Sequence, residues 1–159
     1  MAHVLIRLPW TSLHGPIFQM EKFEFIEHTA DLGLRVTGKT SEDLFKNFAT
    51  TLFELLTDYQ PKEIINKKIT FQAQCLAELL VDWLNELLSL LSADGFLPKE
   101  YHLKISDDKG GKILQAEVKG EEINFENNEL KREIKAATYH GLKIEENDKG
   151  YVAEVIFDV

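Results

Sequence analysis

Apolar residues recur along the chain with two different periods, and together the two periods predict two helices among several strands. Between Leu44 and Leu56, and again between Leu76 and Leu91, they return every three or four positions, which is the spacing of one face of an α-helix. Thr40 or Ser41 is the expected N-cap of the first helix, because a short hydroxyl side chain can accept from its first turn. A glycine after the second helix marks its expected end.

Elsewhere the alternation has period two, which is typical of half-buried strands. It appears in residues 22–28, in a second strand through Leu34 and Val36, in "KKITFQAQ", and through most of the chain after the second helix. "DDKGGK" and "NDKG" are expected hairpin turns. These elements predict a single α+β domain with two principal helices packed on one side of a mainly antiparallel or mixed β-sheet.

The last segment, "YVAEVIFDV", is apolar on both faces near its end. A strand that is covered on both faces normally lies in the middle of a sheet, so we expect this strand to be central. Asp158 would then emerge at one end of the sheet, beside Val159 and its terminal carboxylate.

The length of 159 residues fits one domain with one sizeable core. The first 19 residues differ in character, and Arg7 and Pro9 interrupt their apolar run too early for a membrane span. No small-residue cleavage site follows a clean hydrophobic stretch, as a secretion signal would require. We therefore expect residues 1–19 to be a loosely ordered extension and residues 20–159 to form the domain. No membrane association is expected.

The formal net charge is −9, which argues against a broad phosphate-binding surface and so against direct binding of RNA. Cys75 is the only cysteine, so no internal disulfide can form. This fits a reducing cytoplasm. Cys75 is expected to be a buried, inert thiol, as most free cysteines are.

The acidic turn "HTADLG" offers the one short carboxylate that could meet the end of the last strand, namely Asp31. If the carboxylates of Asp31 and Asp158 lay within about 4 Å, their repulsion would cost roughly 4 kcal/mol at an effective dielectric constant of 20. Such a cluster needs a cation. Oxygen ligands suit Ca²⁺ or Mg²⁺ better than zinc. In the alternative interpretation, Asp31 caps its own turn and Asp158 is simply solvated.

Three further residues are candidates with weaker support. His28 could brace its loop or donate to Asp31 or to a metal-bound water. In "EIKAATYHGLKIE", regular alternation would put Lys135 and His140 on opposite faces, so both could line one pocket only across a bulge. A solvated charge is the default interpretation of Lys135, although it could also receive a phosphate or a carboxylate. The sequence has no nucleophile elbow, and "GGK" lacks the pattern of a phosphate-binding loop.

Several blocks together resemble the archease family in order and spacing: "HTADLGLRVTG", "SEDLFKNFATTLFELLTD", "LLVDWLNELL", "EIKAATYHGLKIE" and "VIFDV". The resemblance covers residues 20–159. It implies an accessory protein of tRNA splicing and RNA repair that activates an RtcB-type RNA ligase by promoting the guanylylation and multiple turnover of that enzyme. It also implies a chain that catalyses no reaction itself and meets RNA only through the ligase.

The same resemblance implies a metal site formed by Asp31, Asp158 and the main-chain oxygen of Val159. Calcium is the expected ion, with magnesium and manganese as alternatives. The extension and Ala137 depart from the family pattern, and neither touches these ligands. Two other functions remain open: a stand-alone metal-dependent phosphoesterase with His28 or His140 as base, and a metal-independent, chaperone-like binding module that uses its apolar helix faces.

Overall fold

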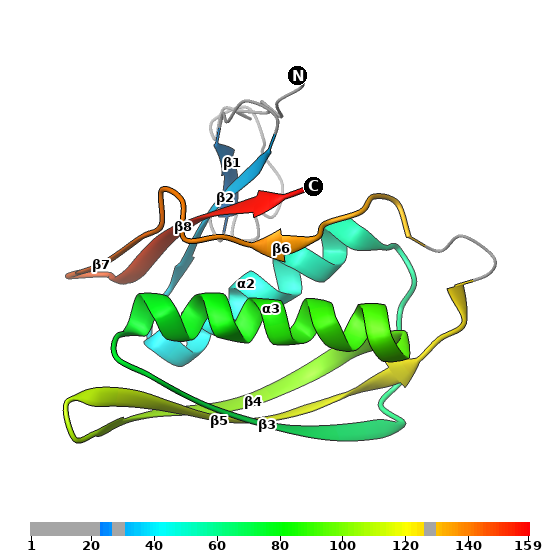
Figure 1. Ribbon diagram of the computed structural model, residues 1–159, viewed down its shortest axis with the longest axis horizontal. Coiled ribbons are helices and arrows are strands. Elements are labelled where there is room, and N and C mark those ends of the chain that lie inside the picture. Colours follow the sequence, from blue (N-terminus) through cyan, green and yellow to red (C-terminus); the bar gives the residue numbers. More distant parts are fainter. Residues whose placement is uncertain (1–22, 27–30, 126–129) are drawn as a thin grey trace.

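The computed structural model describes residues 23–26, 31–125 and 130–159 (Figure 1). The expected extension, residues 1–19, and His28 lie outside the described residues, so the predictions for them remain predictions. The described elements are β1 (Phe23–Ile26), β2 (Leu32–Gly38), α2 (Ser41–Leu56), β3 (Ile65–Ala73), α3 (Leu76–Asp94), β4 (Phe96–Asp108), β5 (Gly111–Glu122), β6 (Ala136–Ala137), β7 (Lys143–Asn147) and β8 (Gly150–Asp158).

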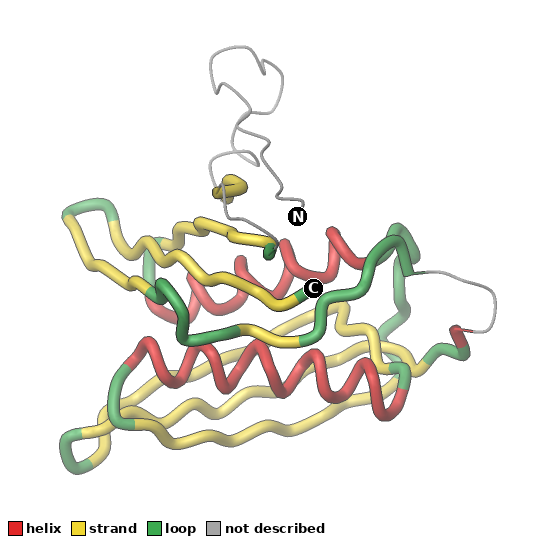
Figure 2. Tube along the Cα trace, turned by 45° about the horizontal axis from the view of Figure 1, so that its top comes forward, coloured by secondary structure: helices red, strands yellow, loops and turns green. Residues whose placement is uncertain are grey.

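The α+β class and the two principal helices are confirmed. The arrangement of the sheet differs from the prediction, because the described strands form two antiparallel sheets. One has the order β1-β2-β8-β6, with β7 also paired to β8, and the other has the order β3-β5-β4. The helices lie between the two sheets instead of on one side of a single sheet (Figures 1 and 2).

The breadth of the apolar surface on each helix explains this layer order. The buried residues of α3 lie on more than one side of the helix: Leu79, Leu80, Val81, Trp83, Leu84, Leu87, Leu88 and Leu91. A helix that is apolar over so much of its circumference must be covered from more than one direction. The α3 helix contacts β3, β4 and β5 below it and β6 and β7 above it, in the view of Figure 1.

Strand β8 is central, as its two apolar faces predicted. It pairs with β2 along one side and with β6 and β7 along the other. Ala153, Val155 and Phe157 are buried and face the helices. The central position fixes the end of β8 against its neighbours on both sides, and this end is where the predicted ligands lie.

The predicted helix ends and hairpin turn are also confirmed. The Thr40 hydroxyl accepts from the backbone N–H of Asp43 at 3.0 Å, and α3 ends at Gly95 in the left-handed region with φ 69°. Lys109 and Gly110 both have positive φ and join β4 to β5 through a two-residue turn. "GGK" is therefore part of a hairpin.

The prediction for Cys75 was wrong, because this thiol is exposed. Cys75 is the N-cap of α3, and its Sγ lies 4.0 Å from a carboxylate oxygen of Glu78. The apolar stripe of the helix begins only after this position, so the adjoining hydrophobic sequence does not bury the thiol.

Candidate functional site

Strand pairing brings the two predicted carboxylate ligands to the same end of one sheet. Leu32, the first residue of β2, is paired with Phe157 of β8. Asp31 directly precedes the first of these residues and Asp158 directly follows the second. Residues opposite each other in an antiparallel ladder have Cα atoms about 4.5–5.5 Å apart. Continuing the ladder by one position sets Asp31 opposite Asp158.

Both carboxylates belong to the outer face of this sheet. Leu32 and Phe157 point toward the helices, with 1% and 0% of their surface exposed. Because successive side chains in a strand alternate between faces, Asp31 and Asp158 fall on the opposite face from these two residues. Asp31 is half-buried and Asp158 is exposed.

On the other side of β8, a main-chain hydrogen bond joins the carbonyl of Asp158 to the segment before β6. The backbone N–H of Lys135 donates to the carbonyl of Asp158 at 2.8 Å. The main-chain oxygens of Val159 lie beyond the last strand residue, and Val159 is 49% exposed.

The donors available at this end fit a hard cation. Two side-chain carboxylates and a main-chain oxygen are ligands of the kind that Ca²⁺ and Mg²⁺ prefer, and both ions complete their coordination with water. Within residues 23–26, 31–125 and 130–159, no three His, Cys, Asp or Glu side chains gather in a group that could hold a metal ion. A metal here would therefore depend on main-chain oxygen and water as well as on the two aspartates.

The ion pair nearest along these strands is separate from the site. Arg35 lies directly opposite Glu154 in the β2–β8 ladder, and its Nε and Nη2 both donate to Oε2 of that glutamate. The pair lies on the same outer face as the aspartates and four residues from each along the strands. The Arg35 guanidinium therefore forms its ion pair with Glu154.

The predicted alternation around Lys135 was wrong. Strand β6 contains only two residues, and Ile134 and Ala137 are both buried although they are three positions apart. Lys135 and His140 are exposed. Thr138 holds the segment to β8 through its backbone N–H and its hydroxyl, which both donate to the Ile156 carbonyl, at 2.9 and 2.8 Å.

Comparison with known proteins identifies the family. The model of the Archease protein family (MTH1598/TM1083) matches residues 23–159. The chain is 33% identical to protein archease of Methanosarcina barkeri, over 89% of this chain and 98% of that one. The chain belongs to the archease family. A second archease, from Saccharolobus islandicus (strain M.14.25 / Kamchatka #1), is 36% identical, over 88% of this chain and 100% of that one.

Solved archease-like structures share the fold. The solution structure of protein 1598 from Methanobacterium thermoautotrophicum superposes with a TM-score of 0.77 at 33% identity, over 88% of this chain and 100% of that one. An archease from Thermotoga maritima, described as a possible chaperone, shares the fold with a TM-score of 0.53 at 23% identity, over 84% of this chain and 94% of that one. Among the described helices of the present family member, none is long and apolar enough to cross a membrane.

One positioning residue of this archease was missed by the sequence analysis. Asn85 of α3 accepts from the backbone N–H of Ala137 at 2.7 Å and donates to the carbonyl of the same residue at 3.1 Å. The side-chain amide thus takes the place of a neighbouring strand for β6. It anchors the segment that carries Lys135 beside Asp158. The polar residue within the apolar stripe of "LVDWLNELL" was the available signal.

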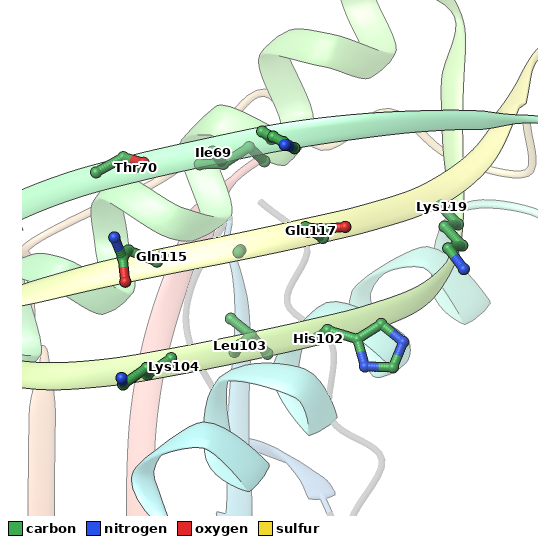
Figure 3. A pocket seen from close by; sticks show the side chains of 10 residues that line it. Ile69, Thr70, His102, Leu103, Lys104, Gln115, Glu117 and Lys119 are labelled. Atoms are coloured by element: carbon green, nitrogen blue, oxygen red, sulfur yellow. The ribbon is translucent and has the colours of Figure 1, made fainter.

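The outer face of the three-stranded sheet of this archease carries a shallow depression of about 700 Å³ (Figure 3). Its polar side chains come from all three strands, with Thr70 on β3, Lys104 on β4, and Gln115, Glu117 and Lys119 on β5. Positive and negative charges are mixed, as on an ordinary solvated sheet face.

Proposed function

We propose that this archease activates an RtcB-type RNA ligase in tRNA splicing and RNA repair, by promoting the guanylylation of the ligase and its multiple turnover. In this proposal the ligase carries out the chemistry, the archease catalyses no reaction, and RNA is met only through the ligase. We further propose that the protein works in the cytoplasm. Family membership and the resemblance of the sequence blocks support the role.

The observation that carries the proposal is the pairing of Leu32 with Phe157. It sets Asp31 and Asp158 at the same end of adjacent strands and on the same face. Like charges on facing positions of a ladder repel each other, and a cation between them relieves this repulsion. We propose that Asp31, Asp158 and a main-chain oxygen of Val159 hold a divalent ion, with calcium preferred over magnesium or manganese.

When bound, the ion would supply positive charge at a carboxylate-rich surface that the archease presents to the ligase. The chain itself would contribute the shape and the charge of the surface that contacts the ligase. The central position of β8 holds Asp158 rigidly, and Asn85 holds the neighbouring segment, so the contact surface needs little ordering on binding. The net charge of −9 would speed encounter with a basic, RNA-binding enzyme.

The direct test measures guanylylation of the purified ligase with limiting archease, in buffer with calcium or with a chelator. Asp31→Asn and Asp158→Asn keep side-chain size and remove charge. We expect each variant to lower the stimulated rate at least about tenfold, which corresponds to about 1.4 kcal/mol of lost stabilisation. Asp148→Asn, in the turn between β7 and β8, is the matched control and should leave the stimulation unchanged. Full stimulation by a folded Asp31→Asn/Asp158→Asn protein would disprove the role of this site.

The two alternative functions have separate tests. A phosphoesterase would hydrolyse p-nitrophenyl phosphate without any ligase and would lose this activity with chelator. A general chaperone needs an exposed apolar surface, but the apolar faces of α2 and α3 are covered by the two sheets. Among the described residues, the large exposed hydrophobic side chains are Ile64, Leu130, Tyr139 and Val159. These features favour the ligase activator.

A further inference from the structure

A cavity of about 210 Å³ lies at the end of α2, where the loop 57–61 passes over the beginning of β4. An engineered cavity of about 150 Å³ in another protein is large enough to bind benzene. The cavity in this chain therefore has room for one six-membered ring with a substituent. It shares no residue with the end of the five-stranded sheet that carries Asp31 and Asp158, called the aspartate end below.

Tyr101 lines the cavity and carries a buried hydroxyl. This side chain is only 6% exposed, and its ring packs edge-on against Trp83, with the ring centroids 6.0 Å apart. Within the described part of the chain, no residue forms a hydrogen bond with the Tyr101 hydroxyl. Buried polar groups nearly always have a partner, so this hydroxyl indicates a missing one.

Burial, and secondarily the charge of Glu54, raises the pKa of Tyr101 above its ordinary value. The phenol therefore stays protonated at any physiological pH and can donate. Glu54 lines the same cavity and is exposed, and among the described residues it forms no ion pair. A proton donor and a charged acceptor thus lie beside one cavity, and each is available to a bound molecule.

The other residues that line the cavity determine which ligand shape and which ligand charge are favoured. The aromatic rings of Phe53 and Tyr59 line the cavity together with the apolar rings of Pro61 and Pro98. Aromatic walls favour a flat apolar ligand. Glu54 and Lys99 carry opposite charges at its rim, and a neutral ligand avoids the cost of burying a net charge.

The wall formed by the loop is held in place from outside. The Tyr59 hydroxyl donates toward the Glu121 carboxylate, whose two oxygens lie 3.0 and 3.2 Å away, and the backbone N–H of Lys62 donates to the same carboxylate at 3.0 Å. The loop is therefore tied to β5. Binding would not have to order it, as expected for a preformed site.

We propose that this cavity binds a neutral single-ring aromatic group bearing a hydroxyl, which accepts from Tyr101 and donates to Glu54. The site goes beyond the activation of a ligase and does not depend on it. The phenol group can come from a free small molecule or from a tyrosine side chain of another protein. Both sources share the same recognition chemistry.

The test is an NMR titration of the ¹⁵N-labelled full chain with phenol, toluene and N-acetyltyrosinamide. Phenol should shift the amide signals around the cavity in a saturable way, with an affinity on the order of 1 mM. Toluene should bind about tenfold more weakly, because it satisfies neither polar group. Binding of N-acetyltyrosinamide as strongly as phenol would assign the site to a side chain, and binding of phenol alone would assign it to a small molecule.

Two variants test the contacts. Tyr101→Phe keeps the ring that packs on Trp83, so the fold should persist, while phenol binding should fall to the level of toluene. Glu54→Gln changes an exposed residue and should weaken phenol binding several-fold, and Glu145→Gln, on β7, is the matched control. Equal affinities for phenol and toluene, or no saturable shift with phenol, would overturn the proposal. Saturable binding that Glu54→Gln leaves unchanged would overturn it as well.

Discussion

Asn85 and Ala137 form a reciprocal pair of hydrogen bonds, 2.7 and 3.1 Å long, between the middle of α3 and the backbone of β6. Replacing Asn85 by alanine leaves one N–H and one C=O group unpaired at a half-buried position. Each such group costs about 1–3 kcal/mol. We expect Asn85→Ala to lower the free energy of unfolding by about 2–4 kcal/mol, measured by urea denaturation.

Asn66→Ala is the control for this substitution, because the Asn66 amide donates to Glu117 on an exposed sheet face. Its effect should stay within about 0.5 kcal/mol. If Asn85→Ala were equally mild, the amide would not be the anchor of the segment from Lys135 to Thr138.

Local pattern was enough to predict the helices and most strands. The apolar stripes of α2 and α3, the Thr40 cap and the Gly95 stop are all encoded within a few residues of where they act. The layer order was not predictable in the same way. That α3 is covered by two sheets depends on which strands pair with β8 and which with β5, and these partners are distant in sequence.

For the site as well, local sequence predicted the residue types, while their arrangement depends on contacts that are distant in the sequence. The residue types of Asp31 and Asp158 predict oxygen ligation, but their proximity depends on the β2–β8 register, which local periodicity does not determine. The alternation expected around Lys135 failed for a related reason. Asn85, about fifty residues earlier in the chain, pairs with Ala137 and sets the local conformation in place of a strand neighbour.

Asp82 provides a prediction about pH. Its pKa is raised chiefly by burial and then by the charge of Glu78 one helical turn away, while a hydrogen bond from Tyr139 opposes the shift. A carboxyl whose pKa is higher in the folded state binds its proton more readily there, so stability falls as pH rises through and above the ordinary value of 3.8. We expect Asp82→Asn to raise the melting temperature at about pH 7.

The gain from Asp82→Asn should shrink as pH is lowered to about 3, where Asp82 is protonated in both states. Thermal melts of both proteins across this range measure the difference. Asp148→Asn, at an exposed turn position, should show no such pH-dependent gap. If the difference in melting temperature grew as the pH was lowered, folding would favour the charged form of Asp82 instead.

Lys67 supplies the cation that the end of α3 lacks. The last turn of this helix has no basic residue, and it ends in Asp94. The Lys67 ammonium lies 3.4 Å from Asp94, 3.0 Å from Glu122 and 5.6 Å from the centre of the Phe96 ring. The hydrogen bond with Glu122 and, to a smaller extent, that with Asp94 raise the pKa of Lys67.

We expect Lys67→Met to cost about 1 kcal/mol of unfolding free energy, because it keeps the apolar stem and removes the charge. Most of this loss should disappear in about 1 M salt, where exposed ion pairs are screened. Lys68→Met, at the next position and on the outer face of the same strand, is the control and should be nearly neutral. A salt-independent loss would show that packing, and not charge, is responsible.

The aspartate end should respond to calcium and to charge removal in opposite directions. Without metal, Asp158→Asn relieves repulsion with Asp31, so the variant should melt at a higher temperature than the unsubstituted protein. With calcium at about one hundred times its dissociation constant, the unsubstituted protein should gain about 2.7 kcal/mol, and the variant should gain far less. Differential scanning calorimetry in chelator and in calcium measures both effects. Equal calcium gains for the two proteins would place the ion elsewhere, and a variant less stable in chelator would show that the Asp158 charge is already compensated within the chain.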